Sequence, residues 1–214
     1  MRRALLLLLT LAACEKGPTP QAPAKPRPTS FAEPLAIGPI SYFNTQCATC
    51  HGQYGVQIAD HNIAKQSTPA AYRAMVEYMV TDRAGSSLPS RDLDAQAAYC
   101  TSLAAAGNDP DVHTEGAPLF VCTKSPINKG GLEGEVTPGS AVTLIAAKGQ
   151  VRIAAEVSGH TWTIPPLQVA NARQSAGDDW FNATLEARKG SALQTIRLAE
   201  EPFKGPRLSP PAAR

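Results

Sequence analysis

Cys47-Ala48-Thr49-Cys50-His51 is the run of residues from which the interpretation of this 214-residue chain starts. Two thiols two residues apart can add to the two vinyl groups of a porphyrin, and an imidazole directly after the second thiol is placed to bind its iron. Zinc would need a second ligand pair at close spacing, but the later cysteines lie far apart. Thiol redox chemistry would need a βαβ frame, which this region lacks. The run predicts one covalent haem c, attached at Cys47 and Cys50, with His51 as the proximal iron ligand.

The amino terminus carries an export signal, as haem attachment outside the cytoplasm requires. Arg2 and Arg3 form a positive region, Leu5 to Leu9 an apolar region too short to span a bilayer, and a run of small residues then leads to Cys14. This ending resembles a bacterial lipoprotein signal, so we expect a signal peptide over 1–13 and acylation of Cys14, which holds the chain to a membrane. The alternative is ordinary cleavage near Ala13 that leaves Cys14 a spare thiol.

A proline-rich segment over 14–30 follows the lipidation site. Its prolines recur every second or third residue among small and polar residues, a composition that favours polyproline II and predicts a semi-rigid tether. Glu15 stands where inner-membrane retention signals of lipoproteins usually carry Asp, which slightly favours the outer membrane. The expected location is therefore the cell envelope, with the protein facing the periplasm.

Composition excludes several classes of protein. Lys and Arg number 20 against 18 Asp and Glu, and removal of Arg2 and Arg3 with the leader leaves the mature chain about neutral. No basic stripe with interleaved aromatic residues is present, so we expect no nucleic-acid partner. No later stretch is long and apolar enough for a transmembrane helix.

The segment 31–107 has the period of helices. A short helix is expected over 41–50, and a second is expected to begin at Ser67 or Thr68 as N-cap, with Pro69 in its first turn. The second helix carries one apolar stripe made of Tyr72, Met75, Val76, Met79 and Val80. A third helix is expected after Pro89-Ser90, with Leu93, Ala97, Cys100 and Leu103 or Ala104 on its inner face.

This segment resembles the class I cytochrome c family. The resemblance rests on Phe43 four residues before the first haem cysteine, on Gly52 and Gly55 after the histidine, and on Ala97-Ala98-Tyr99 to Leu103, which is similar to the terminal helix of that family. It covers about a third of the chain, and only the haem run is highly specific. It implies a small all-α cytochrome c domain over 31–107.

The resemblance leaves the sixth iron ligand open. Many members of the family place a distal methionine in a Met-Pro pair before the last helix, but here that pair reads Leu88-Pro89. We expect Met79 to supply the thioether, with Met75 and His61 as the alternatives. Methionines on such a stripe commonly fill a core, and a loop histidine is commonly only solvated.

The segment 110–200 changes to a period of two. Short alternating runs, such as Val142, Leu144 and Ala146, are separated by turn residues, with Trp162 and Trp180 as large core candidates. This predicts an all-β sandwich domain, which resembles immunoglobulin-like modules in rhythm alone. The predicted fold class is thus two domains, α then β, followed by a disordered tail over 201–214.

Two cysteines remain without a role, Cys100 and Cys122. Leftover thiols in an oxidising compartment tend to pair, so we expect a disulfide between them that joins the two domains. The alternative is two buried free thiols.

The residues predict a membrane-anchored monohaem carrier of single electrons, with redox proteins of the periplasm or membrane as partners. No catalytic residue is predicted, because His113 and His160 stand alone in the sequence. One alternative is a five-coordinate haem enzyme of peroxidase type or a gas sensor. The other is a module that binds a partner or the cell wall and carries an accessory haem.

Overall fold

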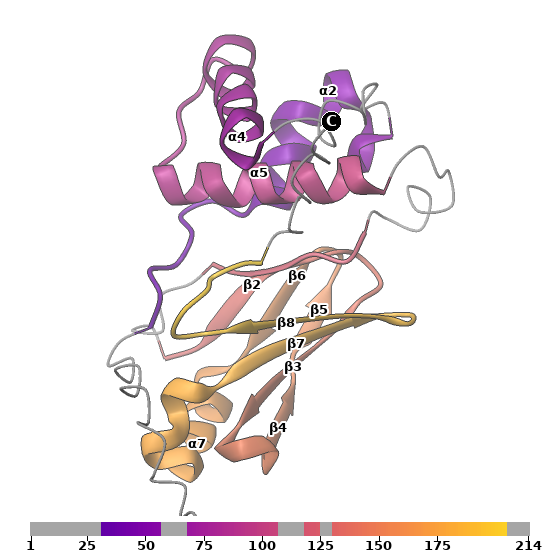
Figure 1. The fold of residues 1–214 in the computed structure, drawn as a ribbon. Helices are drawn as coiled ribbons and strands as arrows, with labels where there is room; N and C mark the ends of the chain where they lie inside the picture. Colours follow the sequence, from indigo (N-terminus) through magenta and orange to yellow (C-terminus); the bar gives the residue numbers. More distant parts are fainter. Residues whose placement is uncertain (1–30, 57–67, 107–117, 125–129, 205–214) are drawn as a thin grey trace, which may run out of the picture.

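The computed structural model describes residues 31–56, 68–106, 118–124 and 130–204. The predicted signal peptide, the tether with Cys14, the predicted ligand His61 and most of the predicted tail lie outside the described residues. The helical segment and the two sheets are stacked end to end, and helix α5 lies between the other helices and the sheets (Figure 1).

The helical segment consists of short pieces. They are α1 (Pro39–Tyr42), the π-helix η1 (Phe43–Cys47), α2 (Ala48–His51), the 3-10 turn η2 (Gln53–Gly55), α4 (Pro69–Tyr78), the π-helix η3 (Met79–Arg83) and α5 (Ser90–Ala105). The predicted start of α4 is confirmed: Thr68 is the N-cap, and its hydroxyl oxygen accepts a 3.2 Å hydrogen bond from the Ala71 amide.

Eight strands form two antiparallel sheets. They are β1 (Val121–Thr123), β2 (Leu132–Val136), β3 (Ala141–Ala146), β4 (Val151–Ala154), β5 (Glu156–Ser158), β6 (Thr161–Ile164), β7 (Thr184–Lys189) and β8 (Ala192–Arg197). One sheet has the strand order β1-β2-β6-β5 and the other β4-β3-β7-β8. Their facing side chains share one core that includes Trp162 and Leu132 from the first sheet and Leu144 and Leu185 from the second.

The alternating run from Val151 to Val157 does not form one strand. It breaks at Ala155, so that β4 belongs to one sheet and β5 to the other. The Ala155 amide donates to the Val142 carbonyl at 2.9 Å, which holds the crossing point against β3. Hydrophobic alternation continues where a chain crosses from one sheet to the other. It shows which side chains face the core, but not which sheet each residue belongs to.

The β region also contains a helix that we did not predict. Helix α7 (Pro166–Ala176) and the 3-10 segment η6 (Gly177–Asn182) close the end of the sheets opposite the helical segment (Figure 1). Trp180, expected as a large core residue, is 1% exposed and lies in η6 rather than in a strand. Two signals for this helix were present in the sequence: Pro166 is in its first turn, and Gly177 follows its end with a φ of 52°.

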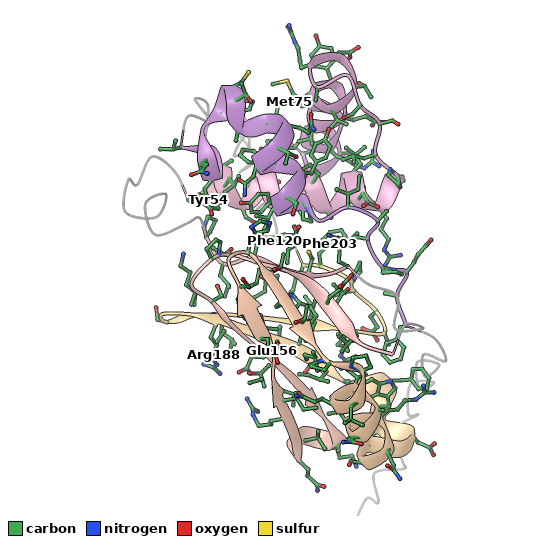
Figure 2. The ribbon with its side chains drawn as sticks, turned by 180° about the vertical axis from the view of Figure 1, so that it is seen from behind. Tyr54, Met75, Phe120, Glu156, Arg188 and Phe203 are labelled. Atoms are coloured by element: carbon green, nitrogen blue, oxygen red, sulfur yellow. The ribbon has the colours of Figure 1, made fainter. Side chains whose placement is uncertain are left out.

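The predicted fold class, an all-α cytochrome c domain followed by an all-β sandwich domain, is wrong. The described residues form two antiparallel sheets together with several helices, and no cytochrome-like all-α domain is evident among them. The physical reason is a shared core. Phe120 and Cys122, from the start of the β region, pack in one buried cluster with Phe43, Tyr99 and Leu103 of the helical segment. Figure 2 shows Phe120 and Phe203 at this junction.

Candidate haem-attachment site

The three residues predicted to hold haem lie on one turn of helical backbone. Cys47 ends η1, and Cys50 and His51 belong to α2, so their spacing of i, i+3 and i+4 places them on one helical face. Gly52 ends α2 with a φ of 71°, a conformation that glycine adopts without strain. Cys47 and His51 are half-buried, Cys50 is exposed, and both thiols are free.

Aromatic side chains surround this turn. The rings of Phe43 and His51 have centroids 6.4 Å apart, and Phe43 packs edge-on against Tyr99 at 5.8 Å. Tyr54 follows the site in a left-handed conformation, with a φ of 54°. Among the described residues the Tyr99 hydroxyl has no hydrogen-bond partner, although the side chain is 0% exposed. Sequence reasoning placed Tyr99 only in a terminal helix and missed its position beside the site.

Cys47 lies where two apolar clusters meet. One cluster contains Phe43 and Tyr99, the other contains Tyr72 and Val76, and both Cys47 and Cys100 pack against each of them. Burial, together with the nearby Cys50, raises the pKa of the Cys47 thiol to about 11. Burial likewise raises the pKa of Cys100 to about 12. Both thiols are therefore protonated at neutral pH.

The structure separates the two methionine candidates. Met79 begins η3 and is 39% exposed. Met75, one turn earlier on α4, is half-buried and packs against the same cluster as Cys47. Figure 2 shows Met75 at the end of the helical segment away from the sheets. Of these two thioethers, only that of Met75 packs against the apolar cluster that also contacts Cys47.

The predicted disulfide between Cys100 and Cys122 is absent, because both residues are free thiols. Gln96 on the preceding turn of α5 donates a 3.4 Å hydrogen bond to the Cys100 sulfur. Cys122 is 0% exposed and sits in β1, where its backbone carbonyl accepts a 3.1 Å hydrogen bond from the Trp162 indole. The alternative of two free thiols describes the structure better, with Cys122 buried and Cys100 half-buried.

His160 is not isolated. The Ser41 hydroxyl lies 3.0 Å from His160 Nε2, and it donates a hydrogen bond to the Glu135 carboxylate. Glu135 is 0% exposed and also accepts a 2.8 Å hydrogen bond from the Ile40 amide. This is not the order of a catalytic triad, in which the imidazole stands between the hydroxyl and the carboxylate. These hydrogen bonds instead hold α1 against the sheets.

The described residues contain no cluster of three His, Cys, Asp or Glu side chains suited to a metal ion. A haem does not need one, because the porphyrin supplies four iron ligands and the protein only the axial ones. Two free thiols and an imidazole on one face, with apolar clusters beside them, fit the donor chemistry of covalent haem.

No protein-family model, curated protein or solved structure matches this chain. Within the part of the chain that the structure describes, no helix has the length and apolar character needed to cross a membrane.

Proposed function

We propose that this chain is an envelope-anchored, monohaem c-type protein that carries single electrons between redox proteins. The observation that supports it is the placement of Cys47, Cys50 and His51 on one helical turn beside two apolar clusters. The proposal does not rest on the all-α fold of class I cytochromes.

The residues of the turn have separate roles in this proposal. Cys47 and Cys50 would hold the haem covalently through thioether bonds to its vinyl groups, and the His51 imidazole would ligate its iron. Phe43 packs near the imidazole and limits its rotation, and the clusters beside Cys47 exclude water from that side. Haem supplies reversible one-electron oxidation of its iron.

Met75 is our choice for the distal ligand, in place of Met79. A thioether that binds iron in an apolar site has to be removed from water first. Met75 already packs against the cluster that contacts Cys47, whereas Met79 is exposed. If His51 and Met75 both ligated the iron, the protein would leave no position on it for a substrate. Such a site exchanges electrons and does not catalyse bond chemistry.

The decisive experiment is expression of the full chain in a host that attaches haem to exported proteins. We expect a red protein whose pigment stays with the polypeptide in acidified organic solvent. The Cys47→Ala/Cys50→Ala variant should be colourless after the same extraction, and Ser102→Ala, which changes a small polar side chain on α5, is the matched control. A wild-type pigment that washes out of the polypeptide would rule out thioether attachment.

A spectrum of the purified protein distinguishes the carrier from a five-coordinate enzyme or sensor. The carrier should be low-spin in both oxidation states and should not bind carbon monoxide when reduced. Rapid carbon monoxide binding by the native ferrous protein would favour the open-site alternative.

Membrane anchoring has its own test. The full chain should fractionate with membranes, and Cys14→Ala should release it into the soluble fraction. Release of both forms together would remove acylation from the proposal and leave the haem chemistry in place.

A further inference from the structure

The chain around the proposed haem-attachment turn has an unusual lack of charge. Residues 34–56 include no Asp, Glu, Lys or Arg, although the whole chain contains 20 Lys and Arg and 18 Asp and Glu. Six side chains of this stretch are exposed and uncharged, and we call them the neutral face: Thr45, Gln46, Thr49, Cys50, Gln53 and Val56.

The helix packed beneath this stretch is uncharged as well. Phe43 of η1 packs edge-on against Tyr99 of α5, with ring centroids 5.8 Å apart. Beyond Asp94, α5 contains no further Asp, Glu, Lys or Arg before it ends at Ala105. Within the described helices of this segment, these four residue types occur only on α4, η3 and the start of α5. The uncharged region therefore continues from the surface into the helix below it.

This lack of charge determines what the neutral face can meet. A charged surface attracts partners of the opposite sign and keeps like copies apart, and salt screens both effects. Two copies of this protein do not repel each other at the neutral face, and the mature chain as a whole is about neutral. An uncharged face is complementary to itself, because a second copy can cover it without removing any charged group from water.

We propose that two copies of this protein meet at their neutral faces and exchange an electron. This inference rests on the proposed function, since a haem attached at Cys50 would bring a redox centre to this exposed surface. One electron passes from the reduced copy to the oxidised copy, which leaves the first ferric and the second ferrous. No proton or other reactant is consumed. The contact is brief, because the neutral face can form no ion pair that would slow its release.

Electron self-exchange in the haem-loaded full chain tests this inference. NMR line widths of the haem methyl groups, in mixtures of the ferrous and ferric protein, give the rate constant. Between about 0.01 M and about 1 M NaCl the Debye length shrinks from roughly 30 Å to roughly 3 Å, yet the wild-type rate constant should change less than about twofold. A charged docking face would instead make the rate constant rise steeply with salt.

Two isosteric double variants locate the face. Gln46→Glu/Gln53→Glu puts two negative charges on the neutral face of each copy, so self-exchange should slow roughly tenfold at low salt and recover at high salt. Gln168→Glu/Gln174→Glu adds the same charge at exposed positions of α7, at the far end of the sheets (Figure 1), and should stay within about twofold of wild type. Equal slowing by both variants, or slowing by neither, would overturn the inference.

A second measurement needs no haem. In the haem-free Cys47→Ala chain, the exposed Cys50 thiol is modified with a cationic or an anionic methanethiosulfonate reagent, and peptide masses follow the reaction. Relative to free cysteine, the two rates at Cys50 should agree within about twofold, and Gln46→Glu/Gln53→Glu should favour the cationic reagent several-fold. A strong wild-type preference for either reagent would show that a charge acts at the neutral face and would refute the inference.

The two proposals fail in different ways. A chain that attaches no haem would remove the proposed function and this inference together. A coloured protein with salt-dependent self-exchange would overturn this inference alone and leave haem attachment in place.

Discussion

The carboxylate of Glu135 and the backbone amide of Ile40 are 2.8 Å apart, although 95 positions separate them in the chain. Glu135 is in β2 and Ile40 in α1, so this hydrogen bond ties the helix that precedes Cys47 to the sheets. Gly38 lies against the same carboxyl group, and a methyl group on Gly38 would overlap it. The segment Cys47–His51 is therefore positioned from its N-terminal side by the β region.

Gly38→Ala should destabilise the protein by about 1–3 kcal/mol, as an added methyl group does in a packed core. The measurement is urea unfolding followed by circular dichroism. A double-mutant cycle with Glu135→Ala supplies the control, because removal of the carboxyl group leaves room for the methyl group. Gly38→Ala should cost clearly less in that background. Equal costs in both backgrounds would show that the carboxyl group is not what excludes the methyl group.

Met75→Leu should convert the ferrous haem to a form that binds carbon monoxide and should remove the thioether-to-iron charge-transfer band. Leucine matches methionine in volume, so the fold should persist. Met79→Leu is the matched control on the next turn, and it should keep both the band and the closed coordination. The reverse pattern would return the distal position to Met79, and no change in either variant would point to a ligand outside the described residues.

The two free thiols predict how many cysteines an alkylating reagent should modify. The haem-loaded protein, unfolded without reductant, should take up iodoacetamide at Cys100 and Cys122 and gain the mass of two adducts. The native protein should react slowly at both sites, because burial raises the pKa of both thiols and the thiolate is the reactive form. Adducts that form only after reduction would show that the two cysteines are paired.

Alkaline pH should destabilise the fold through Cys100. Its pKa is raised from 9.0 to about 12 by burial, so folding favours the protonated thiol. The resulting stability is fully present below pH 9.0 and is lost as the pH rises toward 12. Cys100→Ala removes this contribution, so its urea midpoint should fall less steeply than that of wild type over this range. Parallel curves would show that Cys100 does not titrate differently in the two states.

The sequence predicted some local features well because they depend on neighbouring residues. Thr68 with Pro69 specified the start of α4, and the alternation of Val142 and Leu144 specified β3. The fold-class prediction failed, because nothing in local periodicity shows that Phe120 packs beside Tyr99. The strand switch at Ala155 was hidden for the same reason, since both strands keep the same alternation.

The same limit applies to the candidate site, where some features could be predicted from the sequence and others could not. The sequence predicted a short helix over 41–50, and the structure places Cys47, Cys50 and His51 on one helical face. The choice between Met75 and Met79 was not readable, because both lie on the same predicted stripe and only three-dimensional packing shows which is exposed. The Cys100–Cys122 pairing was inferred only by counting leftover thiols, and the structure leaves both thiols free.

The shared cluster of Phe120 and Cys122 with the helices bears on any attempt to subdivide the protein. A fragment cut after α5 would lose two side chains that are 0% exposed in the intact chain, and would leave Tyr99 facing solvent. We expect such a fragment to aggregate or to be proteolysed, and a haem module for transplantation would have to carry β1 and β2 with it.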